Sequence, residues 1–200
     1  MSDPVKSNNK KSLILVAVAF ILPVILAKIA LDTDFFNRGV TNKGELLNPV
    51  LDLTPVLAET EPKWRIVYVL PAECDLRCEN TLFAMQQVHL SLGKHVERVV
   101  PVVISTESSP KSLLNSTFWQ NVYTRFGAHE GPHTIQMLNA KQKIVNDMFK
   151  NVELNGIFVV DTLNNGMLKH PTFVDESKAV EGSRALLSDI KKLLKLSRIG

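Results

Sequence analysis

The chain has two cysteines, Cys74 and Cys78, separated by three residues. Two thiols at this spacing can form a disulfide, exchange it with another protein, or together hold a soft ion such as Cu(I). They follow an apolar, β-branched segment and stand where a helix is expected to begin, and the positive end of a helix stabilises a thiolate. This position favours redox or metal chemistry over a plain structural disulfide, which at this loop length would add only about 2 kcal/mol.

Histidines are the other residues that could bind a metal. His129 and His133 are four residues apart with Glu130 between them, as in zinc proteases. A protease site needs both rings on one helical face, and Gly131 with Pro132 would break that helix, so we reject this function. His129 or His133 is then a candidate third metal ligand, brought to the cysteines by a loop. The sequence contains no Ser-His-Asp arrangement, phosphate loop, paired-carboxylate site or evident small-molecule site.

A strand and a helix are expected to position the two cysteines. Residues 64–70 (WRIVYVL) are aromatic and β-branched between Pro62 and Pro71, which predicts a buried central strand. After the cysteine loop, apolar residues recur at helical spacing over 76–92, and Gly93 ends that helix. The predicted order is strand, cysteine loop, helix.

A second strand and helix are expected to follow. Residues 97–105 (ERVVPVVIS) predict a strand, in which Pro101 favours a bulge or an edge position because proline cannot donate to a ladder. A helix is expected at about 110–126.

The C-terminal part predicts a hairpin and a final helix. Segments 156–162 and 166–170 flank an Asn-Asn-Gly turn, a strong hairpin signal. A leucine-rich amphipathic helix covers about 186–194, and we interpret its lysines as a solvated outer face rather than a membrane-surface patch. Strands alternating with helices before a hairpin and a last helix indicate an α/β fold, a mixed sheet flanked by helices. This order is that of a thioredoxin-like domain.

An apolar segment near the N-terminus predicts a transmembrane helix. Residues 12–31 contain one charge, Lys28, and are long enough to cover a hydrocarbon core of roughly 30 Å. Lysines precede the segment and aspartates follow it, so the positive-inside rule keeps the N-terminus in the cytoplasm. We expect a cytoplasmic N-terminus at 1–11, the membrane helix at 12–31, a linker at 32–62 and a periplasmic domain at 63–200.

A cleaved signal peptide is the competing interpretation of the same segment. Cleavage after Ala30 or Ala27 would place Lys28 or Ile25 where a small residue is required. The length and the flanking charges favour an uncleaved anchor in a bacterial-type inner membrane.

The charge of the chain argues against a nucleic-acid partner. The formal net charge is +3, and the 23 basic residues are scattered among 20 acidic ones rather than gathered in one stripe.

Several segments together resemble the Sco/SenC family of thioredoxin-like, membrane-anchored periplasmic proteins, which act in cytochrome c oxidase assembly. The resemblance covers roughly residues 42 to 200. It rests on the anchor, the strand before the Cys74-x3-Cys78 pair, Phe158-Val159-Val160-Asp161 with the Gly166 turn, and the closing helix 189–194 (DIKKLL). More narrowly, segments 41–47 (TNKGELL) and 194–200 (LKLSRIG) resemble a short bacterial family associated with oxidase biogenesis.

The resemblance implies an accessory factor that acts on a cytochrome c oxidase subunit or on another oxidase assembly factor. Cys74 and Cys78 would either carry Cu(I) or exchange thiols, with Cys74 attacking and Cys78 resolving. The sequence departs from the family at 150–155 (KNVELN), which lacks the copper-ligand histidine, and the cis-proline expected before strand 156–162 is also missing. The alternative is a non-catalytic docking protein with a structural Cys74–Cys78 disulfide, so whether the chain is an enzyme is open.

Overall fold

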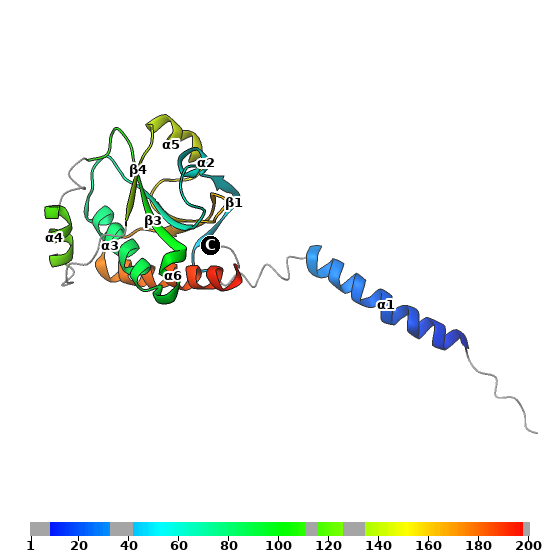
Figure 1. The fold of residues 1–200 in the computed structure, drawn as a ribbon. Coiled ribbons are helices and arrows are strands. Elements are labelled where there is room, and N and C mark those ends of the chain that lie inside the picture. The colour runs from blue at the N-terminus through cyan, green and yellow to red at the C-terminus, as the bar shows by residue number, and fades with distance from the viewer. Residues whose placement is uncertain (1–8, 33–41, 111–115, 126–134, 198–200) are drawn as a thin grey trace, which may run out of the picture. The chain divides into compact units, whose positions relative to one another are not determined.

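The computed structural model describes residues 9–32, 42–110, 116–125 and 135–197 (Figure 1). The chain divides into two compact units, Met1–Thr41 and Asn42–Gly200, and each is described by itself. In the described residues, the first unit contains one helix and the second contains an α/β domain.

The helix of the first unit is α1, Asn9–Asp32. Its segment Lys10–Ile29 is long and apolar enough to cross a membrane, and none of that segment is buried inside the protein. Pro23 lies inside the helix, as membrane helices tolerate. The same length and composition are found in signal sequences near an N-terminus, so α1 is either an anchor or a signal sequence.

The second unit is built on one mixed sheet of six strands in the order β1-β6-β5-β2-β3-β4. Strands β2, β3 and β4 are parallel, whereas β5 is antiparallel to β2, β6 to β5, and β1 to β6. The strands are β1 Glu45–Asp52, β2 Trp64–Val69, β3 Val99–Ser105, β4 Gln136–Asn139, β5 Gly156–Val160 and β6 Asn165–Pro171.

Helices cover both faces of this sheet (Figure 1). Helices α3 and α6 pack on one face with Phe118 of α4, and α2 and α5 pack on the other. The helices are α2 Thr54–Leu57, α3 Leu76–Leu90, α4 Ser116–Arg125, α5 Gln142–Met148 and α6 Glu176–Leu196, with a 3-10 helix at Gly93–Arg98. The sheet between two helical layers confirms the expected α/β, thioredoxin-like fold.

Strand β2 is the centre of the fold, as its sequence predicts. All six of its residues are buried. Ile66 and Tyr68 face the core beneath α3 and α6, while Val67 and Val69 face the core beneath α2 and α5. A strand that is buried on both faces has no polar alternation, which is why this segment reads as a continuous apolar run.

The domain begins at Asn42, within the range 32–62 that the sequence predicts to be a linker. Strand β1 and helix α2 lie within that range, and Leu47, Leu51 and Leu53 are buried in the core. The register of β1 against β6 shifts between Leu46 and Leu51, so the strand bulges around Pro49. This irregularity hides the alternation by which a strand is normally recognised.

Pro101 occupies a position that fits its missing N–H. Strand β3 lies inside the sheet, and Pro101 pairs with Ile66 of β2 in an unshifted register. The β4 ladder covers only residues from Val102 onward, so β3 has one neighbour at Pro101. The expected bulge is not present in the ladder between β2 and β3. Strand β3 resembles an edge strand at Pro101 alone, where β2 is its one neighbour.

Asp189 of α6 ties the beginning of the domain to its last helix. Its side chain is fully buried, and Oδ2 accepts the backbone N–H groups of Lys43 at 2.7 Å and Gly44 at 2.9 Å. Nε2 of His170 lies 3.4 Å from the same oxygen, and neither ring nitrogen has a hydrogen-bond partner among the described residues. Gly44 is required here because a Cβ atom would lie 2.5 Å from that Nε2.

Candidate functional site

Cys74 and Cys78 form a disulfide at the beginning of α3, with their Cα atoms 5.1 Å apart. Cys74 lies in the loop after β2 and is half-buried, whereas Cys78 is the third residue of α3 and is fully buried in the core. The structure therefore brings the two predicted residues together where the sequence places them. Of the two sulfurs, that of Cys74 belongs to the more accessible residue.

Asp75 fixes the geometry of this loop. It is the N-cap of α3, with extended backbone, and its Oδ1 accepts the backbone N–H of Cys78 at 3.1 Å. The carboxylate takes one of the N–H groups through which the helix end would otherwise stabilise a thiolate, and it adds a negative charge beside the sulfurs. The sequence predicts a helix start near this residue, and an aspartate before an apolar helical segment is the signal for such a cap.

A cavity of about 300 Å³ lies beside the cysteine loop. Tyr68 of β2 lines it, and burial raises the pKa of this phenol to about 12, with the Asp75 charge adding to the shift. Arg77 and a hydrogen bond with Thr81 oppose that shift. Tyr68 is thus a neutral hydroxyl near the cysteine loop. From the sequence it is predicted only as part of a buried strand.

The opposite side of this cavity comes from the loop before β5. Leu154 and Asn155 line it together with Thr172, which follows β6. Nη1 of Arg77 donates to the carbonyl of Thr172 at 3.3 Å, so α3 is linked to the end of the hairpin. The residues before β5 that line this cavity are thus a leucine and an asparagine, and neither is a histidine or a proline.

Within the described residues, the two sulfurs are the candidate metal donors of this site. Over the residues that the structure describes, no group of three His, Cys, Asp or Glu side chains could hold a metal ion. Reduced Cys74 and Cys78 are soft donors that fit low-coordinate Cu(I), whereas the disulfide form offers no thiolate. The candidate third ligands His129 and His133 lie outside the described residues.

Two other histidines, His89 and His170, make contacts that stabilise the domain. Nε2 of His89 lies 3.1 Å from the carbonyl oxygen of Val96, which ties α3 to the 3-10 helix. His170 is buried beside Asp189, and burial lowers its pKa while the Asp189 charge opposes this shift. Neither histidine joins the two sulfurs in a group of three ligands within the described part of the chain.

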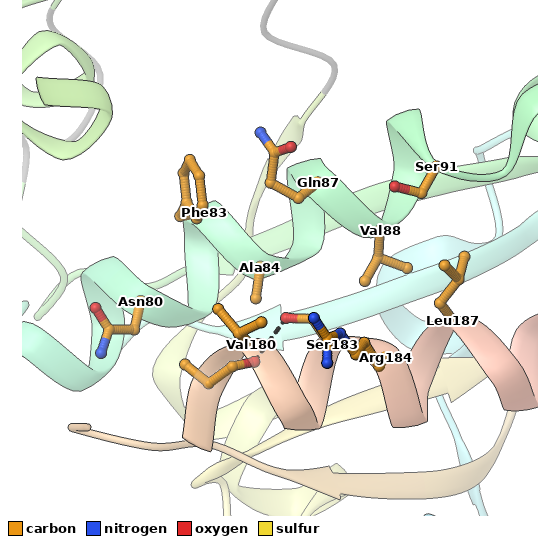
Figure 2. A pocket seen from close by; sticks show the side chains of 11 residues that line it. Asn80, Phe83, Ala84, Gln87, Val88, Ser91, Val180, Ser183, Arg184 and Leu187 are labelled. Atoms are coloured by element: carbon orange, nitrogen blue, oxygen red, sulfur yellow. Dashed lines mark hydrogen bonds between the residues drawn. The ribbon is translucent and has the colours of Figure 1, made fainter. Parts of the chain in front are cut away.

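A separate groove of about 230 Å³ runs between α3 and α6 (Figure 2). Its lining combines apolar side chains, among them Phe83, Ala84 and Val88 from α3 and Val180 and Leu187 from α6, with polar side chains and Arg184. Figure 2 shows Ala84 and Val88 of α3 pointing toward Val180 and Leu187 of α6, whereas Phe83 points away from α6 in this view. The lining contains neither cysteine, so the groove is not part of the redox site.

The comparisons with known proteins agree with this fold. Residues 64–197, about two thirds of the chain, match the family described as transmembrane-like, thioredoxin-like, C-terminal domain. No curated protein matches the chain. The solution structure of apo Sco1 from Thermus thermophilus aligns with a TM-score of 0.50 and 15% identity, over 78% of this chain and 99% of that chain.

Two further solved structures are similar at lower scores. A SCO1/SenC family lipoprotein from Bacillus anthracis is 12% identical, covering 74% of this chain and 96% of that chain with a TM-score of 0.41. A secreted disulfide oxidoreductase from Mycobacterium tuberculosis is 14% identical, covering 64% and 85% with a TM-score of 0.36. At such identities the likeness concerns the fold alone. The family match is what classifies the sequence: the chain belongs to the transmembrane-like, thioredoxin-like C-terminal domain family.

Proposed function

We propose that this chain is a membrane-anchored, periplasm-facing thiol–disulfide exchange factor. Its clients are the copper-ligand cysteines of a cytochrome c oxidase subunit or of another oxidase assembly factor. The observation that supports this proposal is the different burial of the two cysteines at the start of α3: Cys74 is half-buried and Cys78 is fully buried. Exchange requires one sulfur that a client can reach and a second that is protected until the first has reacted.

The exchange takes two displacement steps. The Cys74 thiolate attacks one sulfur of the client disulfide, a mixed disulfide forms, and the client's other sulfur leaves as a thiol after taking a proton. Cys78 then attacks the sulfur of Cys74, which releases the second client thiol and leaves the Cys74–Cys78 disulfide. The client gains two electrons and this chain loses them, so a separate thiol reductant must regenerate the pair.

The oxidase context is supported by the sequence resemblance to the Sco/SenC family rather than by the site geometry. The family match and the likeness to apo Sco1 support the thioredoxin-like fold. The anchor is supported by α1 and by the lysines that precede its apolar segment. In this proposal residues 1–11 are cytoplasmic, α1 spans the inner membrane, and the α/β domain is periplasmic.

Trapping of the mixed disulfide tests the exchange directly. The full chain is reduced, mixed with a peptide whose two cysteines are oxidised, and analysed by mass spectrometry. Cys78→Ser should accumulate the mixed disulfide through Cys74, whereas Cys74→Ser should not, because its remaining sulfur is buried. Equal trapping by both variants would contradict the assigned roles.

The reduction potential separates exchange from the docking alternative. Equilibration of the full chain in thiol redox buffers should give a potential above about −300 mV, near that of its reductant. A value well below about −300 mV would mark a structural bridge and favour the non-catalytic docking protein.

Cu(I) binding by the reduced pair is a second candidate function, favoured by the two soft donors. An anaerobic Cu(I) titration of the reduced chain against a competing chelator measures it, with Cys74→Ser/Cys78→Ser as the control. Stoichiometric binding that the double variant lacks would support copper handling. Absence of competitive binding would remove the metal function and leave thiol exchange intact.

A further inference from the structure

Helix α6 carries exposed cations along one side of its last two turns. Lys191 and Lys195 are exposed and lie four residues apart, so they are neighbours on the same face. Neither has an ion-pair partner among the described residues. Lys192 lies between them and is 3.4 Å from Asp189.

An apolar side chain stands beside these lysines. Leu196 is 81% exposed and follows Lys192 by four residues, so it borders the same face. The apolar face of α6 points the other way, because Leu186, Ile190 and Leu194 are buried in the core. Cations around an exposed leucine form the pattern of a surface that binds at a membrane interface.

The chain from α1 reaches the domain at this same helix. Lys43 and Gly44 donate their backbone N–H groups to Asp189, which precedes Lys191 by two residues. Lys43 is itself exposed and adds a cation beside α6. Lys43 follows Asp32, the last residue of α1, by about eleven residues, which can span at most about 40 Å.

We infer that this lysine face, defined as Lys43, Lys191, Lys195 and Leu196, binds anionic phospholipid headgroups of the membrane that holds α1. The carboxylate of Asp189, which precedes Lys191 by two residues, is buried and bonded to backbone, so the exposed charge of the last two turns of α6 is positive. A bilayer surface lies within reach of the tether, and its negative headgroups complement the lysines. The inference rests on the proposed anchorage and is independent of the proposed cysteine chemistry.

The lysines of α6 thus have more than the solvent-facing role expected from the sequence. The helix is docked through its apolar face, as expected, but the hydrogen bonds to Asp189 hold Lys43, at the start of the domain, beside this helix. Sequence periodicity contains no information on that contact, because Gly44 and Asp189 are 145 residues apart.

The test uses the full chain in lipid nanodiscs, with the Cys74–Cys78 disulfide left oxidised. An environment-sensitive fluorophore is attached to Leu196→Cys, and the discs contain either phosphatidylcholine alone or phosphatidylcholine with one quarter phosphatidylglycerol. We expect emission at least twofold higher in the anionic discs, falling as salt rises because exposed charges are screened. The same label at Leu163→Cys, which is 74% exposed in the β5–β6 turn, should not respond.

Two double variants that each remove two lysines provide the test and its matched control. Lys191→Gln/Lys195→Gln should abolish the response, since each lysine near an anionic surface is worth roughly a fivefold change in occupancy. Lys143→Gln/Lys150→Gln removes the same charge from exposed positions in and just after α5 and should leave the response unchanged. Equal emission in both discs, or an equal loss in both variants, would overturn the inference.

Two other outcomes would overturn it in distinguishable ways. A chain that does not incorporate into discs of either composition would remove the anchorage itself, and the trapping and redox experiments would still report on the cysteines. An emission change in neutral discs only after a client protein is added would assign the lysine face to an acidic protein surface.

Discussion

The Asp75 carboxylate accepts the backbone N–H of Cys78 at 3.1 Å, so one residue both begins α3 and places a negative charge beside the disulfide. The two roles can be separated by substitution. Asparagine is as good an N-cap as aspartate but carries no charge.

Asp75→Asn should therefore raise the alkylation rate of the reduced cysteines about three- to tenfold at pH 7, since a neighbouring anion disfavours the thiolate. Its free energy of unfolding should match that of the wild type. Asp75→Ala should lose about 1 kcal/mol of stability with the cap. Iodoacetamide kinetics and urea unfolding measure the two effects, and an unchanged alkylation rate in Asp75→Asn would show that the charge is irrelevant.

Gly44→Ala should destabilise the domain by about 1–3 kcal/mol, because the added methyl group would overlap the His170 ring. In a His170→Ala background the same substitution should cost much less, and a double-mutant cycle from urea unfolding measures this coupling. Gly93→Ala is the control: its cost comes from a positive φ of 58°, with no atom within 4 Å of the new Cβ. Equal costs of Gly44→Ala in both backgrounds would contradict the contact.

His170 should make stability depend on pH from about 7 downward. Burial lowers its folded-state pKa below 6.5, so below that pH the unfolded chain binds more protons than the folded one. Stability should consequently fall as pH drops below about 6.5 and level off below the folded pKa of His170. Facing groups are Asp189, which opposes the shift, and Lys192 on the same helix. His170→Asn should flatten the slope in urea unfolding at several pH values, and an unchanged slope would assign it to other groups.

Arg65→Lys should destabilise the domain by about 2 kcal/mol, since a lysine cannot satisfy the acceptors around this buried guanidinium. Arg65 is 2% exposed, and its guanidinium donates to the side chains of Thr60 and Asn164 and to the backbone carbonyls of Glu61, Lys63 and Asp161. Arg184→Lys, at an exposed position of α6, should change little. Urea unfolding of both variants gives the comparison, and equal costs would argue against a structural role for the network.

Local patterns explain why much of the fold could be predicted. Strand β2 is an unbroken apolar run because both of its faces are buried, and the β5–β6 hairpin follows from its turn, where Asn164 has a φ of 69°. Helix α6 shows its buried face as leucine periodicity. The cysteine pair at the start of α3 was placed by the same local logic.

Non-local contacts explain what could not be predicted. Strand β1 is bulged at Pro49, and it pairs with a strand more than 100 residues later, so its own sequence gives no clear period. Asp189 resembles any polar residue of an amphipathic helix, yet it is buried because its partners are backbone N–H groups of Lys43 and Gly44. A third metal ligand could not be assigned, because loop sequences do not encode which distant side chain they approach.

Gly44, at the start of the domain, and the cysteine loop lie at the same end of the sheet. Gly44 contacts His170, which is the register partner of Ile157, and Ile157 pairs with Tyr68 near the end of β2. These strands span three spacings, or about 14 Å. For an anchored chain, the greatest distance of Cys74 from the bilayer is then set by the linker length together with this width of the sheet. Cys74 would not reach a client thiol that lies farther from the bilayer than the sum of these two lengths, whatever the reactivity of that thiol.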